Sequence, residues 1–135
     1  MNYLGLDLGT RTLGLAFSKG MIASTLTTIR YVTKDELINK LKQVIEEYNI
    51  DILVLGLPKN MNNSLGPRAQ ETLEFKEQLE KLNYKVVLQD ERLSTVAAHN
   101  YMISADMSRK KRKEKVDSLA ATIILQTYLD KENKK

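Results

Sequence analysis

Three acidic residues stand in sequence contexts that favour metal-dependent chemistry: Asp7 in "YLGLDLGTRTLG", Glu91 in "DERLST" and Asp117 in "VDSLAATIIL". Asp7 interrupts an apolar, strand-like stretch, where an uncompensated carboxylate would be costly to bury. Three carboxylates that converge repel one another unless divalent cations neutralise them. Oxygen ligands suit Mg²⁺ or Mn²⁺, and two such ions about 4 Å apart stabilise both reacting oxygens of a phosphodiester displacement. The three residues are therefore predicted metal ligands and catalytic residues for phosphodiester cleavage.

Each acidic residue also has an ordinary structural interpretation. Asp7 suits a turn ahead of a glycine, Glu91 suits a surface ion pair with the arginine after it, and Asp117 suits the first turn of a helix. Asp90 competes with Glu91, because the sequence alone does not fix which of the two faces inward. The interpretation as a site depends on all three residues occurring together.

Basic and polar residues form two groups that could hold a polyanion. Lys59, Asn60 and Arg68 flank an expected helix start, where free N–H groups favour anions. The run "RKKRKEK" at 109–115 is strongly basic, although the net charge of the chain is only +4. Both groups also fit a solvated loop. The predicted nucleic-acid contacts are Arg11, Lys59, Asn60, Arg68, Arg109, Lys110, Lys111 and Arg112.

Composition limits the class of protein. The chain has 135 residues, 42% of them hydrophobic, which is enough for one domain with a real core. We expect a single domain over residues 1–135, with 131–135 as a flexible tail. There is no cysteine, which excludes disulfides and thiolate metal sites and favours the cytoplasm. The longest apolar run is too short to span a bilayer, and the P-loop and dinucleotide-binding fingerprints do not occur.

Hydrophobic periodicity predicts the elements that must position these residues. Alternation and apolar runs indicate strands at 2–8, 12–18, 21–31, 51–56 and 84–89. Helical spacing follows Thr33, and further helices are expected at 67–82, 94–104 and 116–129. The first three strands are joined by short turns, which predicts an antiparallel meander, and the later strands are joined to it by helical crossovers. This α/β order, with a mixed five-stranded sheet flanked by helices, is the ribonuclease H-like arrangement.

The alternation also assigns faces to the first two strands. Asp7 shares a face with Gly5, and the neighbouring strand offers Gly14 and Ala16 on the same side. Such small residues leave room above the carboxylate. Further along the chain, Ala120 and Ala121 follow Asp117 and permit a close approach of that helix to a sheet.

Four segments together, "GLDLGTRTLG", "GLPKNMNNSLGPRA", "DERLST" and "VDSLAATIIL", resemble the YqgF (RuvX) family over nearly the whole chain. The resemblance implies a ribonuclease H-like nuclease that either matures pre-16S ribosomal RNA or resolves Holliday junctions. By the same resemblance Asp7, Glu91 and Asp117 match the acidic triad of the family. Lys59, Asn60 and Arg68 match its polar loop.

We therefore expect an endonuclease that uses Mg²⁺ or Mn²⁺ and acts on structured RNA, as a monomer or a homodimer. Four-way DNA junctions are the second substrate class. Two other hypotheses stay open at this point. One is an actin-like or sugar-kinase nucleotide site, since "GLDLGT" also resembles their phosphate-binding turn. The other is a non-catalytic nucleic-acid-binding protein whose acidic residues are structural.

Overall fold

Five strands form one mixed sheet in the computed structural model, which describes residues 1–58, 65–90 and 109–133, with the backbone alone over 109–117. The strands are β1 (Tyr3–Leu8), β2 (Thr12–Ser18), β3 (Ser24–Arg30), β4 (Ile52–Leu57) and β5 (Val86–Asp90). Their order across the sheet is β3-β2-β1-β4-β5. β2 pairs antiparallel with both β1 and β3, whereas β4 runs parallel to β1 and β5. The predicted sheet is confirmed.

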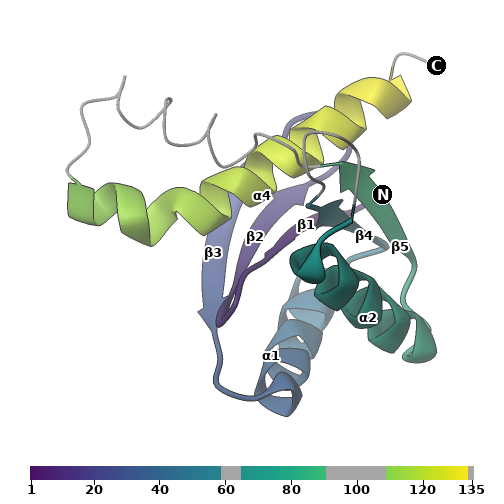
Figure 1. The fold of residues 1–135 in the computed structure, drawn as a ribbon. Coiled ribbons are helices and arrows are strands. Elements are labelled where there is room, and N and C mark those ends of the chain that lie inside the picture. The colour runs from purple at the N-terminus through teal and green to yellow at the C-terminus, as the bar shows by residue number, and fades with distance from the viewer. Residues whose placement is uncertain (59–64, 91–108, 134–135) are drawn as a thin grey trace.

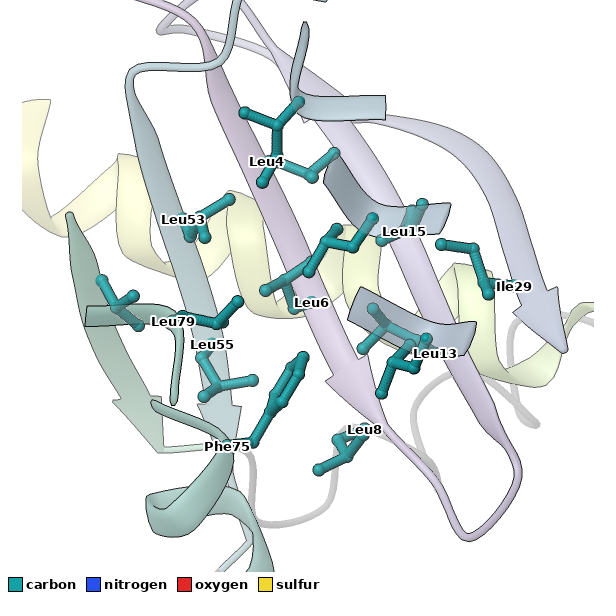
Figure 2. Packing of buried hydrophobic residues seen from close by; sticks show 14 of the residues in the cluster. Leu4, Leu6, Leu8, Leu13, Leu15, Ile29, Leu53, Leu55, Phe75 and Leu79 are labelled. Carbon is teal, nitrogen blue, oxygen red and sulfur yellow. The ribbon is translucent and has the colours of Figure 1, made fainter. Parts of the chain in front are cut away.

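Helices cover both faces of this sheet (Figure 1). Helices α1 (Lys34–Glu47) and α2 (Pro67–Lys81) lie on one face, and α4 (Arg109–Asn133) crosses the other. Leucines of the central strands point toward α1 and α2, and Phe75 and Leu79 of α2 pack among them (Figure 2). A second cluster, which includes Val54, Ala121 and Leu125, lies between the sheet and α4. Both faces are thus buried, which explains why β4 is apolar at every position.

Local sequence signals set the starts of α1 and α2. The Thr33 side chain caps α1 by accepting a hydrogen bond from the Glu36 N–H at 3.2 Å, and Glu36 accepts the Val32 N–H at 2.8 Å. This pair is a variant of the capping box, in which the glutamate accepts the N–H of the residue before the N-cap. The Val32 N–H, and after it Lys40, lower the pKa of the Glu36 carboxyl. α2 begins at Pro67, whose fixed backbone angle suits the first turn of a helix.

The last helix differs from the sequence expectation at both ends. We expected it over 116–129, after a flexible basic run, but α4 begins at Arg109 and ends at Asn133. The run 109–115 is therefore helical, and the N-terminal end of α4 extends beyond the edge strand β3 (Figure 1). At the other end, residues 131–133 continue the helix instead of forming a tail, and the Asn133 side chain donates to the Gly20 carbonyl at 3.2 Å.

Smaller differences concern strand ends. β3 is shorter than the expected 21–31, and β4 is shifted by one residue from the expected 51–56. β5 starts at Val86 and ends at Asp90, not at 84 and 89. The expected helix at 94–104 lies outside the described residues. No helix in the described part of the chain is both long enough and apolar enough to cross a membrane.

Candidate metal and nucleic-acid site

Asp7 lies on the α4 face of β1, as the alternation predicted. It pairs with Gly14 of β2, while Gly5 pairs with Ala16. Helix α4 packs closely against β1 on this face. A Cβ placed on Gly5 would lie 2.8 Å from Leu125 Cβ and 2.9 Å from the Ala121 carbonyl oxygen. The small residue at Gly5 therefore admits the helix, whereas the sequence suggested that it leaves space for a ligand. Asp7 itself is only 6% exposed.

The register places Asp7 in the middle of a row that crosses all five strands. Gly14 pairs with Thr28 of β3 on one side. On the other side Leu6 pairs with Leu55, so Asp7 lies beside Gly56, which in turn pairs with Gln89 of β5. The row, here called the Asp7 row, runs Thr28, Gly14, Asp7, Gly56, Gln89. Neither strand neighbour of Asp7 carries a side chain, and polar residues stand about 10 Å away on both sides.

Gln89 is a polar member of this row that the sequence did not single out. It is 5% exposed, and its Nε2 donates to the Asp90 carbonyl at 3.2 Å. Its Oε1 is buried and has no hydrogen-bond partner among the described residues. A buried acceptor without a partner is unusual and marks a place where a polar ligand would be stabilised. The signal in the sequence was weak, because it consists of one polar residue in an apolar strand.

The register also separates Asp90 from Asp7. Val86 and Leu88 pack with the cluster under α1 and α2, and Val87 packs with the cluster under α4. Because side chains alternate along a strand, Asp90 shares the face of Val86 and Leu88, opposite to Asp7. The preference for Glu91 over Asp90 as a ligand stays a prediction. Glu91 lies outside the described residues.

Helix α4 carries Asp117 and is anchored to the sheet next to it. The hydroxyl of Ser118 forms a hydrogen bond with that of Thr28, the β3 member of the Asp7 row. This contact places Ser118, the residue after Asp117, at the β3 end of the Asp7 row. Within the described residues no three Asp, Glu or His side chains are grouped as metal ligands. The joining of Asp7 with Glu91 and Asp117 therefore stays a prediction.

The turn between β1 and β2 holds Arg11 at the same end of the sheet. The Gly9 N–H donates to the Thr12 carbonyl at 2.7 Å, and a Cβ on Gly9 would lie 2.6 Å from Thr12 Oγ1, so this turn requires glycine. Tyr31 ties the turn to the end of β3: its hydroxyl donates to the Gly9 carbonyl at 2.9 Å, and its N–H to the Arg11 carbonyl at 3.0 Å. Arg11 is exposed.

Tyr31 was not predicted, although its contacts shape the turn next to Asp7. It is 8% exposed, and burial, with a smaller contribution from the Glu71 carboxylate, raises the pKa of its phenol. The phenol therefore stays protonated and remains a hydrogen-bond donor to Gly9. Only tertiary packing shows this role, because in the sequence Tyr31 is one of six tyrosines.

Arg68 reaches the same end of β1 from α2. Its Nη2 donates to the Leu8 carbonyl at 2.9 Å, and the residue is otherwise exposed in the first turn of the helix. A cation is thereby held one residue from Asp7.

Lys59 and Asn60, predicted in the same polar loop, lie outside the described residues. For Arg109, Lys110, Lys111 and Arg112 the structure gives only a helical backbone.

Comparisons with known proteins agree with this architecture. Residues 1–131 match the RuvX family model, which is described as Holliday junction resolvase. A relative from Geobacillus kaustophilus, named "Putative pre-16S rRNA nuclease", is 50% identical over 96% of this chain and 98% of its own length. A relative of the same name from Clostridium botulinum strain Alaska E43 is 47% identical over 99% of this chain and all of its own.

Solved structures show the same fold at low sequence identity. The fowlpox virus Holliday junction resolvase aligns with a TM-score of 0.59 at 14% identity, covering 97% of this chain and 99% of its own. RuvC of Thermus thermophilus, in complex with a Holliday junction substrate, aligns with a TM-score of 0.59 at 15% identity, covering 100% and 97%. The chain therefore belongs to the RuvX family of nucleases and has the ribonuclease H-like fold.

Proposed function

We propose that the protein is an Mg²⁺- or Mn²⁺-dependent endonuclease that cleaves structured RNA, with the 5′ end of pre-16S ribosomal RNA as its substrate. One observation carries the proposal: Asp7 is buried between two glycines, on the face of the sheet that α4 covers. The names of the relatives that share about half of its residues support the choice of ribosomal RNA. The absence of cysteine from the sequence agrees with a cytoplasmic location.

Asp7, Glu91 and Asp117 would hold the cation. Glu91 is preferred to Asp90 because Asp90 shares a face of the sheet with Val86 and Leu88, opposite to Asp7. Asp117 precedes Ala121 by four residues, a spacing that places both on one face of α4, and the Ala121 carbonyl approaches Gly5. In this proposal the three carboxylates come from segments far apart in the sequence and together hold the cation.

The donor chemistry fits a hard divalent cation. The described part of the site offers the Asp7 carboxylate and the unpartnered Gln89 Oε1, both oxygen donors. Oxygen donors favour Mg²⁺ and Mn²⁺ over softer metals. When bound, such a cation supplies charge neutralisation at the phosphodiester and lowers the pKa of water.

Cations at the rim would bind and orient the nucleic-acid backbone. Arg68 and Arg11 come from different elements and lie at the end of the sheet where Asp7 is found. The basic residues 109–112 add further positive charge at the start of α4. They cover about 6 Å of the helix, since a helix rises about 1.5 Å per residue. Phosphate contacts position the substrate without reading its sequence, so cleavage specificity has to come from the shape of the RNA.

Four-way DNA junctions are the second candidate substrate, favoured by the description of the family model. A single assay separates the candidates. The protein is incubated with a pre-16S 5′-end RNA and with a four-way DNA junction, each in Mg²⁺, Mn²⁺ or EDTA. We expect cleavage of the RNA with either metal, no cleavage in EDTA, and slower cleavage of the junction. Faster cleavage of the junction would favour resolvase activity instead.

The acidic site is tested by Asp7→Asn, which keeps the size of the side chain and removes its charge. We expect cleavage to fall on the order of 100-fold or more, because several kcal/mol of electrostatic stabilisation are lost. The matched control is Glu47→Gln, which removes one exposed carboxylate at the last residue of α1. Undiminished cleavage by Asp7→Asn would contradict the site. Metal-dependent RNA binding without cleavage by the wild type would favour a non-catalytic binding protein.

A further inference from the structure

Helix α4 meets β3 and the segment before it through a file of polar contacts about one helical turn apart. The side chains of Ser118 and Thr122 bond the hydroxyls of Thr28 and Thr25, the second pair at 2.9 Å. One turn further, Gln126 accepts the Ala23 N–H at 2.8 Å and donates to the Met21 carbonyl at 3.0 Å. The file runs along the helix directly beside its apolar side, since residues three and four apart are neighbours on a helix surface.

The apolar side of α4 sets the distance of the helix from the sheet. Ala121 and Leu125 pack against Gly5 at close range, which sets the height of the helix above the sheet. Apolar contacts have no directional preference and therefore resist sliding along the helix axis only weakly. Hydrogen bonds are directional, so the polar file sets the axial position and rotation of α4 relative to the strands.

The Thr28–Ser118 pair differs from the rest of the file in two ways. Thr28 belongs to the Asp7 row, and Ser118 is bonded covalently to Asp117. Ser118 is also 5% exposed, whereas the bond between Thr25 and Thr122 is exposed to solvent. Among the described residues, Ser118 is the member of the file nearest the start of α4.

We propose that Thr28 and Ser118 form a positioning pair that sets the place of Asp117 relative to Asp7 in the metal site. This inference rests on the proposed function. Metal ligands must be held within about 0.5 Å of the productive geometry, and groups that orient ligands typically contribute 10- to 100-fold in metal affinity. A hydroxyl pair adjacent to one ligand and in the row of another is suited to this task. Neither residue contacts the substrate in this role.

The test compares Thr28→Val and Ser118→Ala with the matched pair Thr25→Val and Thr122→Ala, one turn further along α4. Mn²⁺ binding is measured by electron paramagnetic resonance on the full chain, without substrate. Cleavage is measured separately, as kcat and KM at rising Mn²⁺ concentration. Thr28→Ser, which keeps the hydroxyl, serves as the rescue variant. Thermal unfolding of every variant shows whether the fold is intact.

We expect Thr28→Val and Ser118→Ala to weaken Mn²⁺ binding about 10- to 100-fold. The Mn²⁺ concentration for half-maximal cleavage should rise by the same factor, with KM for RNA unchanged. The two control variants and Thr28→Ser should stay within about twofold of the wild type in metal binding, as expected of changes that leave the ligands in place.

Two opposite results are distinguishable. A wild type that binds Mn²⁺, with Thr28→Val and Ser118→Ala binding it equally well, would overturn the positioning role alone. So would an equal loss in the control pair, because the file would then act as a whole on stability. A wild type that binds no Mn²⁺ would overturn the proposed function, and the positioning role with it.

Discussion

Arg68 Nη2 donates a hydrogen bond to the main-chain carbonyl of Leu8 at 2.9 Å, which joins the first turn of α2 to the end of the strand that carries Asp7. One bond of the guanidinium is thus used within the protein, and it holds the group at the end of β1. The remaining N–H groups of this exposed side chain are available to phosphate oxygens, because a guanidinium has five donors.

Arg68→Ala is expected to weaken RNA binding uniformly across sequences. One phosphate contact fewer should reduce the slope of log affinity against log salt by about 0.7 to 1. Fluorescence anisotropy with a labelled structured RNA at several salt concentrations measures both quantities. Lys81→Ala is the control, since it removes the same charge from the far end of α2. An unchanged salt slope in Arg68→Ala would exclude the phosphate contact.

Tyr31→Phe is expected to lower the free energy of unfolding by about 1 kcal/mol at neutral pH, the typical contribution of one hydrogen bond. The lost bond is the one from the phenol to the Gly9 carbonyl. Urea denaturation at pH 7 gives the difference. Because that bond holds the turn with Arg11, RNA affinity should fall as well, and unchanged affinity would show that the turn keeps its shape without Tyr31.

Tyr31 also predicts the behaviour of the protein in alkali. Burial and the Glu71 carboxylate raise the pKa of the phenol above its ordinary value of 10.0. The folded state therefore holds its proton more tightly than the unfolded state, so this contribution is complete below pH 10 and is lost as the pH rises through the folded pKa. Urea denaturation from pH 8 to 11 should show a steeper loss of stability in the wild type than in Tyr31→Phe. Parallel curves would contradict this assignment.

Gly5→Ala is expected to destabilise the protein by about 1 to 3 kcal/mol, as overpacking in a core does. The added methyl group would meet Leu125 Cβ at 2.8 Å and the Ala121 carbonyl at 2.9 Å, and neither atom is the end of a flexible side chain. α4 must therefore move away from the sheet, and Asp117 with it. Cleavage measured well below the unfolding temperature should fall further than the loss of folded protein explains. Full activity per folded molecule would show that the site tolerates this shift.

Gln89→Met is expected to raise the free energy of unfolding by about 1 kcal/mol. The change removes a buried acceptor that has no partner in the described part of the chain, at the loss of one long hydrogen bond to Asp90. Urea denaturation gives the size of the gain. If the Gln89 oxygen serves the metal site, Mn²⁺ affinity falls in the same variant. A less stable variant would mean that the carboxamide is better satisfied than its contacts indicate.

The faces of the central strands could be predicted from the sequence because alternation is a local property. Gly5 and Asp7 on one side of β1, and Leu4 and Leu6 on the other, follow directly from a period of two. The helix start after Thr33 was equally readable, since both capping contacts lie within four residues. The apolar run of β4 is typical of a strand covered on both faces, as the structure shows.

The start of α4 could not be predicted in the same way. The run 109–115 lacks the apolar positions that mark an amphipathic helix, and basic residues near a helix N-terminus oppose the helix dipole. Lysine and arginine nevertheless have high helix propensity, and no glycine or proline interrupts the run. The helix propensity of the basic residues therefore agrees with the structure of 109–115, whereas the lack of hydrophobic periodicity had favoured a loop.

The face of the sheet on which Asp90 lies could not be read from the sequence and depended on tertiary structure. β5 is only five residues long, and its phase becomes clear only when Val86 and Val87 are seen to enter opposite cores. Gln89 and Thr28 belong to the candidate site for a similar reason, because cross-strand register brings them into line with Asp7. No short-range pattern in the sequence reports such a register.

The attachment of α4 has a consequence for how the protein folds. The bond between Ala23 and Gln126 joins residues 103 positions apart, and that between Gly20 and Asn133 joins residues 113 apart. Contacts of such long range form late, because the entropy of closing large loops must first be overcome. A partly folded chain with the sheet alone would carry Asp7 but no docked α4. In the proposed site, Asp117 would reach its place relative to Asp7 only once α4 has docked onto the sheet.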